Sequence, residues 1–177
     1  VPFTALLSGV PAVVRAAEAS HAFLWRDTWV AELVRENADD RNWDWSSHIQ
    51  RGLLQDGFLC LAIVTERLEG LASLAFDRSR AGPPGTTLVY IEYLATAPWN
   101  RGVGGAMLRG VGRVLIQTTV RISVALGYDG RIGLHSKPAA EAFYREKLGL
   151  LDVGREMAED GEWVYFEATP EVARRLL

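Results

Sequence analysis

The pattern of apolar and polar positions predicts a chain that starts with helices and continues as an α/β core. Residues 3–7 form an apolar run of strand length. Pro11 is tolerated in the first turn of a helix, and residues 12–36 then read as mostly helical. A polar break precedes a second helical pattern over residues 43–54. The start of the chain is therefore predicted to be a mainly helical region.

The remainder of the chain alternates between strand and helix patterns. Residues 58–65 and 70–76 are apolar runs around a charged turn, which is typical of a β-hairpin, and residues 88–96 are the longest strand candidate. A glycine turn, a helix, a strand, a helix from Pro138, a closing hairpin and a short C-terminal helix follow. Without an internal repeat, this order predicts one α/β domain with a mixed sheet. Its predicted parts are a helical region (1–57), a core (58–168) and a C-terminal helix (169–177).

A glycine turn that suits a diphosphate occurs twice, as Arg101-Gly-Val-Gly104 and Arg109-Gly-Val-Gly112. The first amides of a helix lack hydrogen-bond acceptors within the helix, and the helix dipole adds positive charge at that end. A phosphate bound there accepts hydrogen bonds from these amides and is attracted by the positive charge. A helix from Gly104 to Leu126 would be about 34 Å long and one from Gly112 about 22 Å. The following strand spans only about 20 Å. The second copy is therefore the predicted phosphate turn, and the first a mobile loop that leads into it.

Composition excludes several classes of partner. The 177 residues are 49% apolar and carry 19 basic and 22 acidic side chains, a net charge of -3 without a basic block, which argues against nucleic acid. The single Cys60 allows no disulfide framework and suggests the cytoplasm. No apolar run approaches the roughly 18 residues of a membrane span, so no membrane partner is expected. The sequence contains no Cys/His cluster of the kind that would indicate a metal site.

Three stretches of the chain resemble the GCN5-related N-acetyltransferase (GNAT) superfamily, in order and in spacing. They are Tyr90-Ile-Glu-Tyr-Leu-Ala-Thr-Ala-Pro98, then Arg109-Gly-Val-Gly-Arg-Val-Leu115, then Gly130-Arg-Ile-Gly-Leu-His-Ser136 with Ala140-Glu-Ala-Phe-Tyr144 and Leu148-Gly-Leu150. The resemblance covers roughly residues 58 to 168. It implies a mixed, mostly antiparallel sheet flanked by helices, with a splayed parallel strand pair at the cofactor site. It also implies acetyl transfer from acetyl coenzyme A to an amine.

The resemblance assigns the cofactor contacts. The pantetheine arm would pair with backbone at Leu94, Ala95 and Thr96, and the pyrophosphate would lie on the amides of Arg109, Gly110, Val111, Gly112, Arg113 and Val114. The sequence departs from the family's pattern at two places. The family's phosphate turn, basic-x-x-Gly-x-(Gly or Ala), is matched better by residues 101–106, which keeps the first copy as an alternative. Lys137 stands where the family often has Asn, and a lysine there could reach a phosphate instead.

Two residues are candidates for the chemistry. The resemblance puts the hydroxyl of Tyr144 near the coenzyme sulfur, where it would line the cofactor site and act as the acid; the alternative is a packed helix face beside Phe143. Glu92 shares a face of its strand with Tyr90 and Leu94 because side chains alternate along a strand. Burial would raise the pKa of such a carboxylate toward that of a base. The alternative for Glu92 is a structural ion pair with an arginine.

Other residues are candidates for the acceptor side. His135 lies near the end of its strand and could line the cleft or serve only structure. Trp25 and Trp29 share a helix face through their four-residue spacing, and could wall a pocket for a flat or cationic group. Ordinary packing against the sheet is the alternative. The acids that would attract an amine there are Asp27, Asp40 and Asp44.

The sequence thus predicts an acetyl-coenzyme-A-dependent N-acetyltransferase that uses direct transfer in a ternary complex. The acceptor would be a small or peptide amine, and the closing hairpin or the C-terminal helix would offer a surface for a homodimer. The alternative is a non-catalytic acyl-coenzyme-A-binding sensor or partner-binding module. A nucleotide-binding domain of another fold is disfavoured because neither turn is followed by a Lys-Ser/Thr pair.

Overall fold

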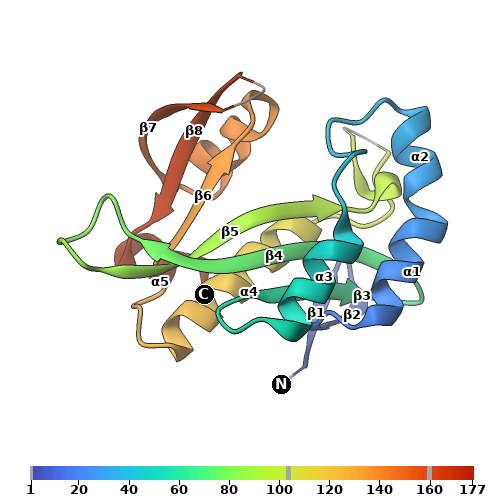
Figure 1. Cartoon of the computed structure of the whole chain (residues 1–177), viewed down its shortest axis with the longest axis horizontal. Helices are drawn as coiled ribbons and strands as arrows, with labels where there is room; N and C mark the ends of the chain where they lie inside the picture. Colours follow the sequence, from blue (N-terminus) through green and yellow to red (C-terminus); the bar gives the residue numbers. More distant parts are fainter. Residues whose placement is uncertain (1, 103–104, 159–160) are drawn as a thin grey trace. The chain divides into compact units, whose positions relative to one another are not determined.

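The computed structural model of the chain describes residues 2–102, 105–158 and 161–177. Eight strands form a mixed sheet in the order β1-β2-β3-β4-β5-β6-β8-β7 (Figure 1). β5 pairs with β6 in parallel through Val89–Ile91 and Ile132–Leu134, whereas β1–β2, β2–β3, β3–β4, β6–β8 and β7–β8 are antiparallel. The predicted mixed, mostly antiparallel sheet flanked by helices is therefore confirmed.

The chain forms two compact units. One comprises Val1–Leu74 and Tyr93–Leu115, and the other Ala75–Glu92 and Ile116–Leu177. Three elements pass from one unit into the other: β4 (Leu68–Arg78), β5 (Thr87–Thr96) and α4 (Val111–Ala125). The boundaries predicted from the sequence stay predictions.

The first unit begins with a β-hairpin. Of the mostly helical segment predicted over residues 12–36, residues 12–16 therefore belong to a strand, and the helical part begins at Ala19. β1 (Phe3–Leu7) and β2 (Val10–Ala16) are joined by Ser8 and Gly9, whose φ angles of 51° and 85° are those of a tight hairpin turn. Alternate residues of β2 point in opposite directions: Ala12 and Val14 are buried, whereas Val10 and Val13 are exposed. This two-residue period, rather than a helical one, decides the structure there.

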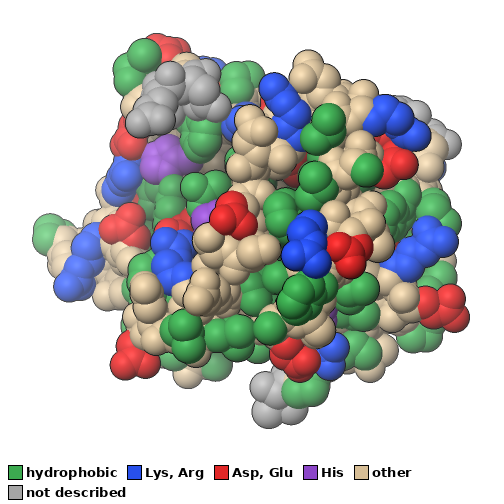
Figure 2. Space-filling view, turned by 45° about the vertical axis from the view of Figure 1, so that its right-hand side comes forward, with side chains coloured by type: hydrophobic (Ala, Val, Ile, Leu, Met, Phe, Trp, Pro, Cys, Tyr) green, Lys and Arg blue, Asp and Glu red, His purple; other side chains and the backbone are tan. Residues whose placement is uncertain are grey.

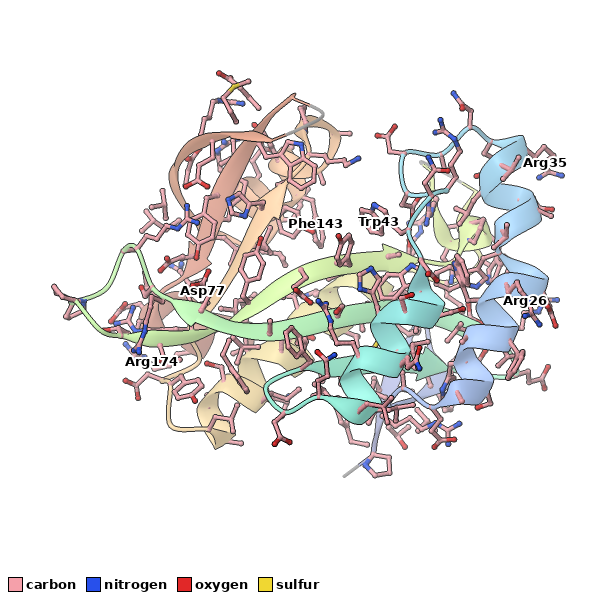
Figure 3. The ribbon with its side chains drawn as sticks, viewed as in Figure 1. Arg26, Arg35, Trp43, Asp77, Phe143 and Arg174 are labelled. Atoms are coloured by element: carbon pink, nitrogen blue, oxygen red, sulfur yellow. The ribbon has the colours of Figure 1, made fainter. Side chains whose placement is uncertain are left out.

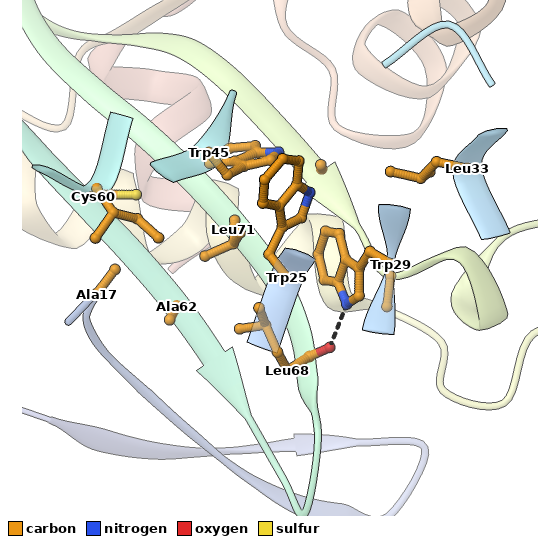
Figure 4. Packing of buried hydrophobic residues seen from close by; sticks show 12 residues of the cluster. Ala17, Trp25, Trp29, Leu33, Trp45, Cys60, Ala62, Leu68 and Leu71 are labelled. Carbon is orange, nitrogen blue, oxygen red and sulfur yellow. Dashed lines mark hydrogen bonds between the residues drawn. The ribbon is translucent and has the colours of Figure 1, made fainter. Parts of the chain in front are cut away.

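Three helices follow the hairpin: α1 (Ala19–Thr28), α2 (Val30–Arg35) and α3 (Trp45–Leu54). Glu18 and His21 form a capping box at the start of α1, and Asp44 caps α3 through Ser47. α3 contacts both α1 and β3 (Leu59–Val64). The buried side chains between these elements form one apolar cluster (Figure 4), in which the Trp29 indole donates a 3.1 Å hydrogen bond to the Leu68 carbonyl.

α4 starts at Val111 and has 15 residues, which corresponds to about 22 Å. The shorter of the two helices considered from the sequence is therefore the one that forms. The start of α4 lies close to β4, because a Cβ atom on Gly70 would be 2.5 Å from Val111 Cγ1 and 3.3 Å from Leu115 Cδ1. The missing side chain of Gly70 thus lets the end of the glycine turn approach the sheet.

The second unit is built from the remaining strands and a C-terminal helix: β6 (Ile132–Ser136), β7 (Leu151–Ala158), β8 (Gly161–Ala168) and α5 (Pro170–Leu176). The segment after Ser136 is less regular than the predicted helix. It comprises a 3-10 turn (Pro138–Ala140) and a π-helical segment (Phe143–Lys147). Tyr144, in the latter, packs against Phe166 of β8 with ring centroids 5.9 Å apart.

None of the helices described is long and apolar enough to cross a bilayer, and no group of three or more His, Cys, Asp or Glu side chains among the described residues is arranged to hold a metal ion. On the face drawn in Figure 2, basic and acidic side chains are interspersed rather than gathered in blocks of one sign.

The close approach at Gly70 yields a prediction for stability. Gly70→Ala should lower the free energy of unfolding by about 1 to 3 kcal/mol, because the new methyl group overlaps the stiff side chain of Val111. Gly105→Ala is the matched control, since no atom lies within 4 Å of its added Cβ. Urea unfolding of both variants measures this difference. Equal unfolding midpoints for Gly70→Ala and Gly105→Ala would show that Gly70 is not needed for close packing.

Candidate functional site

The glycine turn before α4 presents a short row of backbone amides. Gly110 has a φ of 91°, which a side chain would strain, and its carbonyl accepts the first intrahelical bond, from the Val114 amide at 2.9 Å. The amides of Val111, Gly112 and Arg113 therefore have no acceptor within the helix. These three donors are called the cradle below, and amides in this position at helix N-termini are a common binding site for anions.

The cradle is narrower than the sequence predicted. The amide of Val114 is already used within the helix, and the amide of Arg109 donates to the Ser8 hydroxyl at 2.9 Å. The side chains of Arg109 and Arg113 are exposed and have no ion pair among the described residues. Both positive charges therefore lie near the cradle and are available to an anion.

The first copy of the turn supplies a structural arginine. Arg101 forms a bidentate ion pair with Asp40, at 2.7 and 2.6 Å, and also donates to the Thr96 carbonyl at 2.9 and 2.7 Å. Its side chain is only 27% exposed, and that of Asp40 11%. Arg101 is thus committed to holding the end of β5, while Val103 and Gly104 lie outside the described residues.

The predicted pantetheine-binding backbone differs in availability from residue to residue. The Thr96 carbonyl already accepts the two bonds from Arg101. Ala95 is buried, Leu94 is half-buried, and their pairing with a ligand stays a prediction. Asp40, which the sequence offered as an attractor for an amine, is neutralised by Arg101 instead.

A buried carboxylate anchors the segment between β5 and the glycine turn. Glu69 of β4 is 3% exposed and accepts from the Thr65 hydroxyl (2.6 Å), the Trp99 indole (2.8 Å) and the Asn100 amide (2.7 Å). Asn100 must therefore turn its oxygen the other way, where it accepts from the Leu108 amide at 2.9 Å. This chain of bonds fixes the residue that directly precedes Arg109.

The two tryptophans proposed for the acceptor side lie in the core. Trp29 is fully buried and Trp25 is 8% exposed, the position of packing residues, which the sequence had left as the alternative. Trp43, labelled in Figure 3, is half-buried and meets Tyr93 edge-on with ring centroids 5.0 Å apart. The other two predicted acids have partners: Asp27 pairs with Arg26, and Asp44 caps α3, where the Ser47 hydroxyl lowers the pKa of its carboxyl group.

Tyr144 of the second unit is buried, and burial raises the pKa of its phenol to about 12. The hydroxyl is therefore protonated at every pH at which the protein would work. Its ring contacts those of Phe143 and Phe166, and the described residues show no hydrogen bond to its hydroxyl. Both facts suit a hydrogen-bond donor.

The other predicted residues of this unit are partly accessible. Glu92 is half-buried on the same side of β5 as Tyr90. The ammonium of Lys137 lies 5.5 Å from the centre of the Trp163 ring. His135 is half-buried and has two polar partners, the Tyr90 hydroxyl at 2.7 Å and the Glu156 carboxylate at 2.9 Å. The sequence did not single out Tyr90 or Glu156.

The chain is similar in fold to solved structures that include acetyltransferases. An uncharacterized protein from Bacillus halodurans gives a TM-score of 0.72 at 13% identity, covering 99% of this chain and 93% of that one. The ribosomal-protein-S5-alanine acetyltransferase from Vibrio fischeri gives 0.65 at 14% identity, with 97% of both chains covered. A chimera of spermidine N-acetyltransferase SpeG from Vibrio cholerae gives 0.62 at 14% identity, covering 92% of this chain and 98% of that one.

No protein-family model and no curated protein sequence matches the chain. Solved structures of similar fold include an acetyltransferase of the GNAT family from Streptococcus pneumoniae, at a TM-score of 0.56 and 15% identity, covering 89% of this chain and 98% of that one. The chain therefore has the fold of GNAT acetyltransferases, as its sequence stretches predicted.

The two arginines of the repeated turn should differ in their effect on stability. Arg101→Gln leaves the largely buried carboxylate of Asp40 without a cation, which should cost about 3 kcal/mol of unfolding free energy. Arg109→Gln, at an exposed side chain, should change it by less than about 0.5 kcal/mol. Thermal and urea unfolding without ligand measure both values. Similar losses in the two variants would contradict the structural role of Arg101.

Proposed function

We propose that this protein is an N-acetyltransferase that moves an acetyl group directly from acetyl coenzyme A to a primary amine in a ternary complex. The observation that carries the proposal is the cradle of unpaired amides at the start of α4 in a chain with the GNAT fold. Similar folds in solved acetyltransferases for a ribosomal-protein alanine and for spermidine support an amine as the acceptor class.

The residues of the turn fit a diphosphate. Val111, Gly112 and Arg113 provide amide donors, and Arg109 and Arg113 provide positive charge. Gly112 keeps the approach to these amides free of a side chain. Acetyl coenzyme A would supply an activated thioester, and this turn would hold its diphosphate.

Tyr144 would stabilise the leaving sulfur. A phenol with a pKa of about 12 does not give up its proton fully to a thiolate of pKa about 8.5, since that transfer is uphill by about 5 kcal/mol. A hydrogen bond from the neutral hydroxyl to the developing negative charge needs no such transfer. We therefore assign Tyr144 to charge stabilisation rather than to complete protonation of the thiolate.

Binding of acetyl coenzyme A is the first test, by titration calorimetry on the wild type and on three variants. Gly112→Glu puts bulk and negative charge at the cradle and should weaken binding by about 100-fold or more, and Arg109→Gln by about 10-fold. Gly104→Glu should leave binding nearly unchanged. Loss at Gly104→Glu alone would move the phosphate site to the first copy of the turn. Absence of wild-type binding would overturn the proposal.

Turnover tests the role of Tyr144. Tyr144→Phe should lower kcat by about 100-fold, the typical cost of removing one donor to a developing charge, while acetyl coenzyme A still binds. The assay follows thiol release with spermidine, tyramine and an alanine-starting peptide as acceptors. Unchanged kcat would remove Tyr144 from the chemistry. Binding of acetyl coenzyme A without wild-type turnover on any of these amines would favour the non-catalytic acyl-coenzyme-A-binding module.

A further inference from the structure

A chain of polar side chains crosses one face of the second unit. Tyr90 lies beside Gly133 in the parallel pairing of β5 and β6, and His135, two residues further along β6, lies opposite Tyr165 of β8. By strand alternation these side chains share a face. The Tyr90 hydroxyl is 2.7 Å from His135 Nδ1, and His135 Nε2 is 2.9 Å from Glu156 Oε2 on β7.

The partners of His135 fix its protonation. A carboxylate only accepts hydrogen bonds, so Nε2 of His135 carries the hydrogen that points to Glu156. Burial, followed by the nearby charge of Arg80, lowers the pKa of His135 below 6.5, which leaves the ring neutral at pH 7. Nδ1 then has a free lone pair, and the Tyr90 hydroxyl donates to it. The direction of both hydrogen bonds is therefore set.

Three further titratable groups act on His135 or lie against it: Arg80, Asp77 and Tyr165. Arg80, in the segment after β4, forms an ion pair with Glu156 and stacks over the Tyr165 ring, with its guanidinium carbon 3.9 Å from the ring centre. The Tyr165 ring lies 4.8 Å from the imidazole. Asp77 of β4 acts on His135 through its charge and partly offsets Arg80.

We propose that Tyr90, His135 and Glu156 form a proton relay in which the Tyr90 oxygen takes the proton of the attacking amine. The inference rests on the proposed function and adds residues to it. A neutral phenol is a poor base by itself. It becomes effective when its own proton leaves at the same time for an imidazole. In serine hydrolases the same transfer of a hydroxyl proton to histidine activates the oxygen, there as a nucleophile. Tyr90 is half-buried and shares its strand face with Glu92, the base predicted from the sequence.

The amine nitrogen forms a bond to the acetyl carbon, and the carbon–sulfur bond breaks with the electron pair going to the coenzyme A thiolate. The nitrogen proton passes to the Tyr90 oxygen while the Tyr90 proton passes to Nδ1 of His135. The resulting imidazolium is paired with Glu156 until it loses the proton to water. Tyr90 is thus the catalytic group, and His135 and Glu156 act through it.

The test measures kcat/KM against pH with the best amine of the panel above. Tyr90→Phe and His135→Gln should each lower kcat/KM by about 100-fold or more. The double variant should lose no more activity than the less active single variant, because the two residues act as a unit. Tyr128→Phe, outside the relay, is the matched control. Calorimetry should show unchanged binding of acetyl coenzyme A to all four proteins.

Two charge variants separate a relay from a purely structural network. Activity requires neutral His135, so it rises with pH through the pKa of that ring, below 6.5. Arg80→Gln removes a cation, raises this pKa and should move the acidic limb of the profile to higher pH. Glu156→Gln removes the anion that stabilises the imidazolium and should move the limb to lower pH with a reduced plateau.

The outcomes keep the two proposals apart. If Tyr90→Phe leaves the wild-type turnover intact, the relay is overturned but the proposed function is not. The same holds if neither charge variant moves the acidic limb of the pH profile. Nitrogen NMR of His135 that finds the hydrogen on Nδ1 would also overturn the relay, whatever the turnover. Absence of wild-type turnover on every amine would overturn the proposed function and the relay with it.

Discussion

The carboxylate of Glu69 is the group on which the first unit's candidate site depends. It is buried, and three side-chain donors satisfy it in place of water, because an unpaired carboxylate in that position would be prohibitively costly. Its backbone carbonyl also accepts from the amide of Ala97, so one residue of β4 holds both the end of β5 and the turn that follows. Since a carboxylate is acceptor-only, it also dictates which end of Asn100 faces Leu108. Replacing any of these donors would disturb the path of the chain into the glycine turn.

The same segment shows how two nearly identical sequence copies come to have different tasks. Arg101 faces Asp40, 61 residues away in the sequence, and the resulting ion pair removes it from the set of possible phosphate ligands. Arg109 has no such partner among the residues described, and its turn leads directly into the free amides of α4. The local motif is therefore not what separates the copies. The separation comes from long-range pairing and from the close approach that Gly70 allows.

The sequence predicted most of the strands and the fold class because strand runs, glycine turns and helix lengths are local signals. The short helix before β6 could be inferred because a crossover must match the strand it returns beside. The second strand of the first hairpin was predicted as helix because Pro11 and a run of alanines and valines fit a helix as well as a strand. The turn at Ser8-Gly9 decides between the two. The sequence could not predict that Asp40 pairs with Arg101, or that His135 binds Tyr90 and Glu156. No local sequence signal indicates which distant partner a polar side chain contacts.

Two phenols of the second unit illustrate how surroundings, rather than residue type, set a chemical role. Tyr144 is surrounded by apolar rings, and burial raises its pKa to about 12, so it holds its proton and can only lend a hydrogen bond. Tyr90 donates to a neutral imidazole that is itself backed by a carboxylate, so its proton has a place to go. An amine that attacks a thioester must lose a proton, and the departing sulfur must gain stabilisation. Tyr90 suits the first requirement and Tyr144 the second, because their surroundings differ.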